Sequence, residues 1–193
     1  LKKAKVKSLQ GWAKFRDGKT VEVETETGVQ VVRAETIVIA TGSLPTELPF
    51  LPFGGKVISS TEALALKEVP TALAVVGGGY IGLELGTAFA KMGAKVTVVE
   101  ALPRILPLYG AELTRPIAKR LDELGVTVLT GAKAKGLSSK GDALLVETAD
   151  GKETKIAADH VLVTVGRKPA TEGWGLEEID LDRTGPFIRI DDQ

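Results

Sequence analysis

The sequence contains one segment whose residue types and spacing suit phosphate binding, GGGYIG at residues 77–82. Gly77, Gly79 and Gly82 have the G-x-G-x-x-G spacing, between an apolar run and a predicted helix. In such a turn Gly77 permits the sharp change of direction, Gly79 lets the backbone approach a pyrophosphate, and Gly82 lets the helix pack close to the strand. The first helical N–H groups and the helix dipole stabilise the phosphate charge. Surface turns produce this glycine pattern by chance, so its surroundings decide its meaning.

An acidic residue follows at the spacing that a dinucleotide-binding unit requires. Glu100 ends the next apolar run, 23 residues after Gly77, where a carboxylate accepts hydrogen bonds from the adenosine ribose. A carboxylate there repels a 2′-phosphate, so the pattern favours NAD over NADP. Taken alone, Glu100 is a polar residue at a strand end. The combination of strand, glycines, helix and spacing indicates dinucleotide binding.

The residues around the loop predict the elements that would position it. Apolar strands alternate with helical patterns, which is typical of a parallel sheet. The expected strands are residues 20–25, 36–40, 72–76, 95–99, 126–129 and 160–165, and the expected helices are 80–92 and 111–124. Ser59 to Thr61 supply caps for a further short helix, and Gly93 and Gly125 are predicted left-handed caps. Turn signals at Gly141 and Gly151 indicate hairpins.

Two segments resemble each other without a gap, residues 32–45 and 156–169. In each an acidic residue, Glu35 or Asp159, precedes an apolar run and a glycine turn. One interpretation is that any buried strand flanked in this way looks similar. The other, which we favour, is a duplicated dinucleotide-binding unit whose first copy has a strand buried on both faces at residues 36–40. The glycine loop of that copy would precede the first residue, so we expect the chain to be a fragment.

Composition excludes several classes of function. The 193 residues carry 25 basic and 25 acidic side chains, so no basic field is available for nucleic acid. No apolar run approaches the roughly 20 residues of a membrane span. Cysteine is absent and His160 is the single histidine, which leaves no disulfide, thiolate or His-cluster metal site. We expect no metal, no nucleic-acid or membrane partner, and a cytoplasmic location, or the mitochondrial matrix in a eukaryote.

Six motifs, in this order, resemble the flavin-dependent pyridine nucleotide–disulfide oxidoreductases. They are IVIATGS (37–43), ISSTEAL (58–64), VVGGGYIGLELG (75–86), VTVVE (96–100), RILPLYGAEL (104–113) and TVGRKP (164–169). They run through almost the whole chain, and within the family they are most like the branch that oxidises dihydrolipoamide. The resemblance implies an α/β fold: a Rossmann-type three-layer NAD-binding domain with a β-meander at residues 48–172, flanked by partial FAD-domain segments at 1–47 and 173–193.

The resemblance also assigns residues to two cofactors. For NAD it implies contacts from the loop, the nicotinamide-side acid, the ribose acid and two backbone positions, namely Gly77, Gly78, Gly79, Tyr80, Ile81, Gly82, Glu84, Glu100, Ala134 and Gly166. For FAD it implies contacts from Ala13, Thr41, Gly42 and Ser43. Tyr80 matches a position that covers the flavin in some relatives; alternatively its ring packs the first helical turn.

The sequence also departs from the family pattern. The redox cysteine pair, the first FAD glycine motif and the His–Glu acid–base pair are absent from these residues, so we expect the chain alone to be inactive. In the whole enzyme, electrons would pass from dihydrolipoamide through the cysteines and FAD to NAD, in a homodimer within a 2-oxoacid dehydrogenase complex. The alternatives are another member, such as mercuric or glutathione reductase, and a non-catalytic NAD-binding module. The reductases prefer NADP and carry basic residues where this chain has Ala101 and Leu102.

Overall fold

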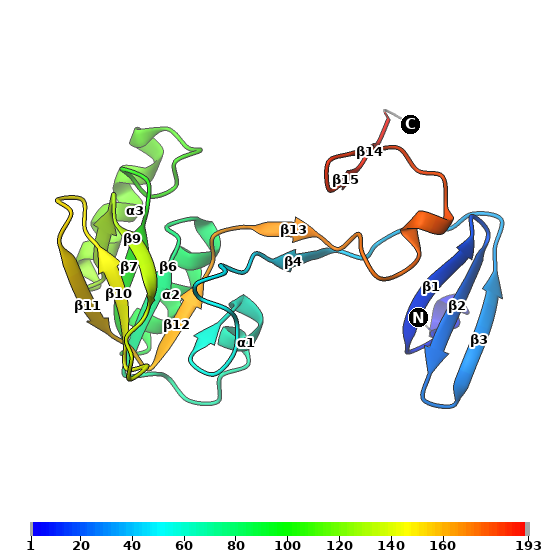
Figure 1. Ribbon diagram of the computed structural model, residues 1–193, viewed down its shortest axis with the longest axis horizontal. Coiled ribbons are helices and arrows are strands. Elements are labelled where there is room, and N and C mark those ends of the chain that lie inside the picture. Colours follow the sequence, from blue (N-terminus) through cyan, green and yellow to red (C-terminus); the bar gives the residue numbers. More distant parts are fainter. Residues whose placement is uncertain (1, 192–193) are drawn as a thin grey trace. The chain divides into compact units, whose positions relative to one another are not determined.

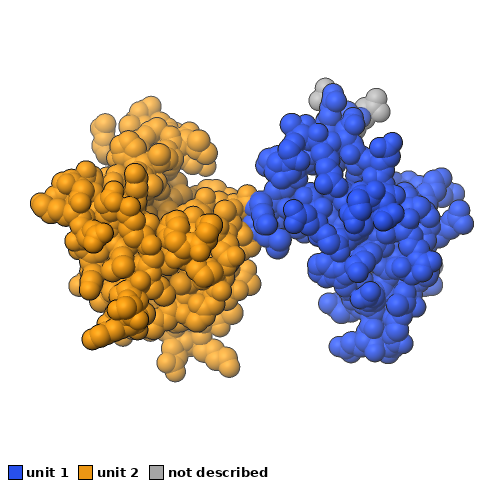
Figure 2. Space-filling view, in the orientation of Figure 1, with its two compact units in different colours: residues 1–44, 168–193 blue, residues 45–167 orange. Residues whose placement is uncertain are grey.

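The computed structural model describes residues 2–191, which form two compact units (Figures 1 and 2). Unit 1 consists of residues 1–44 and 168–193, and unit 2 consists of residues 45–167. The chain leaves unit 1 at β4 (Ser43–Pro45) and returns at β13 (Arg167–Pro169). These two strands pair as a two-stranded ribbon.

Unit 2 is built on a parallel sheet with the strand order β5-β12-β6-β7-β8. The strands are β5 (Val57–Ile58), β6 (Ala72–Val76), β7 (Lys95–Glu100), β8 (Thr127–Thr130) and β12 (His160–Val163). The helices are α1 (Ser60–Leu64), α2 (Tyr80–Lys91) and α3 (Ala111–Glu123). An antiparallel meander consists of β9 (Lys133–Leu137), β10 (Ala143–Glu147) and β11 (Glu153–Ala157). In Figure 1 the meander covers one face of the sheet and the helices α2 and α3 lie on the other.

Alternation along the central strands produces the two cores of this three-layer arrangement. Leu73 and Val75 of β6 face the helices, in a cluster that includes Phe89 of α2. Ala74 and Val76 face the meander, in a second cluster. Because successive strand residues point to opposite faces, a strand covered on both sides must be apolar throughout. The α/β three-layer fold predicted from the sequence is confirmed.

The predicted helices around the site are also confirmed. Helix α2 ends at Lys91 and is followed by Gly93 with a φ of +104°, and α3 is followed by Gly125 with a φ of +71°. Both are left-handed positions that glycine occupies without a Cβ penalty. Helix α1 begins after Ser59 with a capping box, in which Ser59 and Glu62 satisfy each other's free backbone N–H groups.

The strand predicted at residues 36–40 does not form, and that prediction was wrong. Its counterpart in the second segment is β12, which lies between β5 and β6 and hydrogen-bonds to both. Residues 36–40 have no such neighbours within residues 2–191, and Val38 is 85% exposed. Since a buried parallel strand needs pairing partners for its backbone groups, the apolar pattern alone was insufficient.

The two similar segments meet each other in the connecting ribbon. The Thr46 N–H donates to the Gly166 carbonyl at 3.0 Å, and the Ala170 N–H donates to the Gly42 carbonyl at 3.0 Å. In the ungapped match Gly42 corresponds to Gly166 and Thr46 to Ala170, so each bond is the counterpart of the other. The ribbon therefore has a local two-fold relation between equivalent positions.

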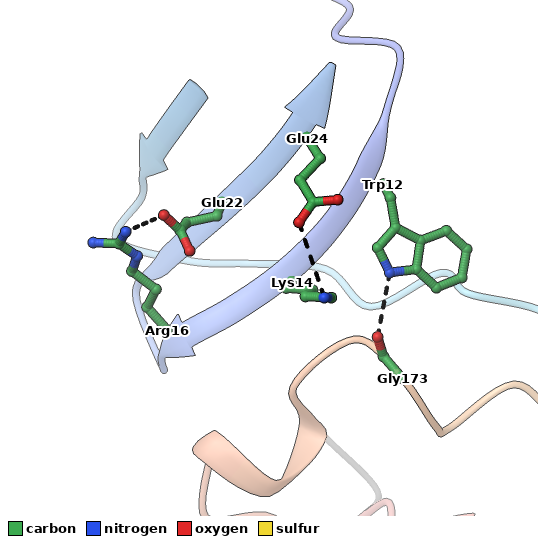
Figure 3. A network of polar contacts seen from close by, with 6 residues as sticks. All are labelled: Trp12, Lys14, Arg16, Glu22, Glu24 and Gly173. Atoms are coloured by element: carbon green, nitrogen blue, oxygen red, sulfur yellow. Dashed lines mark hydrogen bonds and ion pairs between the residues drawn. The ribbon is translucent and has the colours of Figure 1, made fainter. Parts of the chain in front are cut away.

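Unit 1 contains an antiparallel meander of β1 (Trp12–Asp17), β2 (Thr20–Thr25) and β3 (Gly28–Arg33). Ion pairs Lys14–Glu24 and Arg16–Glu22 cross between β1 and β2 (Figure 3). A short hairpin of β14 (Arg183–Thr184) and β15 (Phe187–Ile188) follows near the end of the described chain.

The return segment of unit 1 packs on β1. The Trp12 indole N–H donates to the Gly173 carbonyl at 3.2 Å (Figure 3). The Phe15 N–H donates to the Trp174 carbonyl at 2.9 Å, and the rings of these two residues lie 5.7 Å apart. These contacts join residues distant in sequence, so both parts of unit 1 belong to one body.

Candidate dinucleotide-binding cleft

A cleft of about 980 Å³ lies in unit 2 at the carboxyl ends of the parallel strands. Its walls come from the glycine loop, the end of β7, the loop that follows it, the start of β9 and residues 164–167. The chain runs from β6 to β7 and β8 on one side and returns to β12 on the other. Ligands of open α/β sheets bind at this reversal of strand order, so topology alone points to this position.

Two glycines of the loop are required by the protein itself. Gly77 has a φ of +106°, and a Cβ there would lie 2.7 Å from the Thr164 carbonyl oxygen. A Cβ on Gly82 would overlap the Gly77 carbonyl and lie 2.5 Å from Thr164 Oγ1. The turn out of β6 and the close start of α2 therefore exclude side chains at both positions.

Gly79 differs from Gly77 and Gly82. Its φ of −79° and ψ of 176° suit any residue, and a Cβ there would meet no heavy atom within 4 Å. It is the N-cap of α2, and no side chain caps the helix. The N–H groups of the first turn are thus left for another acceptor, and a helix N-terminus of this kind favours an anion. Neither backbone conformation nor packing within the chain explains glycine at this position.

Glu100 fastens the glycine loop to the end of β7. Its side chain is buried, with 8% of its surface exposed. The Gly78 N–H donates to Glu100 Oε2 at 2.6 Å, and the Leu102 N–H donates to Oε1 at 2.8 Å. Each carboxylate oxygen accepts more than one hydrogen bond, so both retain capacity for hydroxyl donors. A Cβ on Gly78 would lie 3.0 Å from both Oε2 and Ile105 Cγ2, which explains the middle glycine of GGG.

Most of the NAD residues predicted from the sequence line this one cleft. They are Gly77, Gly79, Tyr80, Ile81, Glu100, Ala134 and Gly166. Gly78 and Gly82 are buried and support the loop, whereas Glu84 is exposed on α2 and does not line the cleft. Tyr80 is 64% exposed. The predicted FAD residues all belong to unit 1 and are exposed, namely Ala13, Thr41, Gly42 and Ser43.

The structure adds cleft residues that the sequence did not single out. Lys133 and Lys135 of β9 join Arg167 in the lining, where Glu100 is the single acidic member among the described residues. The Lys135 ammonium contacts Glu147 at 2.7 Å and lowers the pKa of that carboxyl through this hydrogen bond and through its charge. Isolated lysines in a strand do not form a motif that could be recognised in the sequence. They reach the cleft because β9 lies beside β7, and that arrangement depends on tertiary packing.

Two negative findings apply to residues 2–191. No group of three or more His, Asp or Glu side chains could hold a metal ion there. No helix in this part of the chain is long and apolar enough to cross a membrane.

A parallel sheet with a glycine loop, a strand-end acid and a covering meander is the Rossmann-like architecture of flavoprotein disulfide reductases. The model of the pyridine nucleotide-disulphide oxidoreductase family matches residues 1–193, so the chain belongs to this family. It is 54% identical to the dihydrolipoyl dehydrogenase of Pseudomonas aeruginosa over 100% of the chain and 41% of that protein. It is 45% identical to the dihydrolipoyl dehydrogenase of Geobacillus stearothermophilus, over 100% of the chain and 42% of that protein.

A solved structure shows the same fold. The HOCl-induced flavoprotein disulfide reductase RclA from Escherichia coli matches 95% of this chain and 41% of its own, with 30% identity and a TM-score of 0.83. The chain thus spans about two fifths of the length of the relatives that it matches.

Proposed function

We propose that this chain is the NAD(H)-binding portion of a dihydrolipoyl dehydrogenase, which oxidises dihydrolipoamide to lipoamide while reducing NAD⁺ to NADH. The observation that carries the proposal is Gly79, where glycine has no role inside the protein and open space meets the uncapped N-terminus of α2. A ligand pyrophosphate accounts for both features. The choice of enzyme within the family rests on the identity to the Pseudomonas aeruginosa protein.

The residues of the cleft fit NAD in both charge and shape. The backbone of Gly79 and the first turn of α2 would bind the pyrophosphate, and Glu100 would accept hydrogen bonds from the adenosine ribose hydroxyls. Bound NAD supplies the hydride acceptor. Ala134 and Gly166 would contact it through their backbones, and Glu84 would orient the nicotinamide end after a side-chain movement.

The remaining assignments concern the whole protein. We assign FAD to Ala13 and residues 41–43, in a protein that also supplies the redox cysteines. We further propose a cytoplasmic homodimer that works within a 2-oxoacid dehydrogenase complex. Residues 1–193 alone bind the last electron carrier and perform none of the sulfur chemistry, since the sequence has no cysteine.

Cofactor choice tests the proposal. Calorimetry on the 193-residue chain should show that NAD binds more tightly than NADP, by about tenfold or more. The reason is that two like charges about 4 Å apart repel by about 1 kcal/mol in bulk water and by about 4 kcal/mol near a protein surface. Glu100→Gln removes the charge with little change of shape, so the preference should narrow. Glu68→Gln, which changes an exposed acid outside the cleft, should leave it unchanged. Equal affinities for NAD and NADP in the unmodified chain would contradict the assignment.

A further inference from the structure

The loop between β7 and α3, residues 101–110, forms an apolar wall of the cleft. Leu106, Pro107, Leu108 and Tyr109 all line it. Leu106 is anchored in the helix-side core with 7% of its surface exposed, whereas Leu108 is 95% exposed and Tyr109 49%. The tip of the loop therefore presents apolar surface to the cleft rather than to the core.

Arg104 holds this tip in place. Its Nη1 donates to the Tyr109 carbonyl at 2.7 Å, and its Nη2 donates to the Pro107 carbonyl at 2.7 Å. The two carbonyls bracket Leu108 along the chain. Because a guanidinium presents its donors in a rigid planar fork, these two bonds fix the backbone on both sides of Leu108. Arg104 itself does not line the cleft.

The same loop is tied to the glycine motif. The Leu106 N–H donates to the Gly78 carbonyl at 2.9 Å, and the Gly78 N–H in turn donates to Glu100 Oε2. Leu106 has a φ of +49°, a left-handed conformation that residues other than glycine rarely adopt. Such a conformation persists where the surroundings fix it. The position of the tip is thus set relative to the phosphate loop.

We propose that Arg104 is a positioning residue that holds Leu108 against the adenine ring of the bound dinucleotide. The inference rests on the proposed NAD function, in which Glu100, directly before this loop, binds the adenosine ribose. The neighbouring apolar tip then meets the base. An uncharged flat ring suits apolar side chains, whereas ribose and phosphate need polar partners. Arg104 acts through the two carbonyls and not on the ligand.

Arg104→Met tests this role, since methionine keeps much of the apolar stem and removes the donors. Arg115→Met is the matched control, because Arg115 is an exposed arginine of α3 outside the cleft. The affinities of the 193-residue chain for NAD, ADP-ribose and nicotinamide mononucleotide are measured by calorimetry. For R104M we expect about tenfold weaker binding of the two adenine-containing ligands and unchanged binding of the mononucleotide. R115M should match the unmodified chain for all three.

Two further measurements keep the test decisive if R104M folds poorly. Leu108→Ala changes a side chain that is 95% exposed, so folding should be unaffected. It should weaken NAD and ADP-ribose selectively, whereas Leu113→Ala, at an exposed leucine of α3 outside the cleft, should not. In the absence of ligand, amide hydrogen exchange at Leu106 and Tyr109 should be faster in R104M than in R115M.

The outcomes separate this inference from the proposed function. Equal NAD affinity in R104M and R115M, or in L108A and L113A, would overturn the role of the tip. Equal weakening of all three ligands would overturn the adenine assignment. Failure of the unmodified chain to bind NAD or ADP-ribose at all would instead overturn the proposed function.

Discussion

Gly79 and Gly82 belong to one motif, yet the folded chain requires glycine only at position 82. A Cβ at Gly82 would overlap the Gly77 carbonyl, so that position is set by packing between helix and strand. At Gly79 the backbone is ordinary and the space beside it is empty. If the proposed function is right, Gly82 serves the fold and Gly79 serves the ligand, so variants at these two positions should separate the two roles.

Gly79→Val should weaken NAD binding and leave the unliganded chain nearly as stable as before. A branched side chain would occupy the space where phosphate oxygens approach the N–H groups, and each charge-assisted hydrogen bond lost there is worth about 1.5–3 kcal/mol. One such loss corresponds to about tenfold in affinity or more. Calorimetry with NAD and the melting temperature without ligand, measured on the same variant, test both halves of this expectation.

Gly82→Ala is the matched contrast, with the larger effect on stability. Its Cβ must displace backbone and Thr164 Oγ1, and overpacking of this kind costs about 1–3 kcal/mol. A G79V variant that melts as low as G82A, with unchanged NAD affinity in the folded fraction, would mean that Gly79 is a turn residue only.

For Glu100, the sequence predicted the position of the side chain but not its hydrogen-bond partners. Its position followed from spacing after the glycine loop, and the structure brings it into the same cleft. Its hydrogen bonds to the Gly78 and Leu102 N–H groups could not be predicted from the sequence, because almost every residue has the same backbone donor. The hydrogen bonds from Arg104 to the Pro107 and Tyr109 carbonyls could not be predicted either, because backbone acceptors are also alike at every residue.

At the scale of elements, α1 depends on its cap more than on its length. Five residues are too few for an independent helix. The Ser59 hydroxyl donates to Glu62 Oε2 at 2.5 Å, the Ser59 N–H donates to the same atom at 2.8 Å, and the Thr61 N–H donates to Ser59 Oγ at 3.1 Å. Two hydrogen bonds lower the pKa of Glu62. The larger contribution comes from the Ser59 hydroxyl and the next from the Ser59 backbone N–H.

The stabilisation from Glu62 should depend on pH. Because its folded pKa is depressed, its contribution is present above the unfolded pKa of about 4.3 and is lost as pH falls through the folded value. Glu62→Gln should therefore lower the melting temperature of unit 2 at neutral pH, and the difference from the unmodified chain should shrink as the pH falls below the unfolded pKa. Ser59→Ala, which removes the cap, should cost about 1 kcal/mol. A Glu62→Gln difference that stays constant between these pH values would contradict this role of the carboxylate.

Elements were predictable where local pattern and tertiary neighbours agreed. The run at 160–163 became β12 because β5 and β6 flank it. The similar run at 36–40 did not become a strand, although its apolar pattern is as strong. Strand formation depends on partners that a local window does not contain, whereas the glycine caps of α2 and α3 act within their own turns and were predictable.

At the scale of the whole molecule, the two units differ in how much core they contain. Within residues 2–191, three buried apolar side chains lie in unit 1, namely Val23, Trp174 and Leu176, and the other 26 lie in unit 2. All residues of β3 are exposed, and Val29 is 59% exposed. Burial of apolar area is the main favourable term in folding, so unit 1 of this chain should open more readily than unit 2.

Binding of NAD should therefore protect unit 2, and not unit 1, against amide hydrogen exchange. A ligand that binds only the folded state stabilises it by about 2.7 kcal/mol at a concentration of about 100 times its Kd. The cleft lies wholly within residues 45–167, so this increment should slow amide exchange in β6 and β7, where exchange requires opening of the unit 2 core. Exchange in β1 and β3 should be unchanged. G79V, which keeps the fold but loses the ligand, is the control, and NAD should have no effect on its exchange. Equal protection of β1 and β6 by NAD would show that both units unfold together, contrary to their unequal cores.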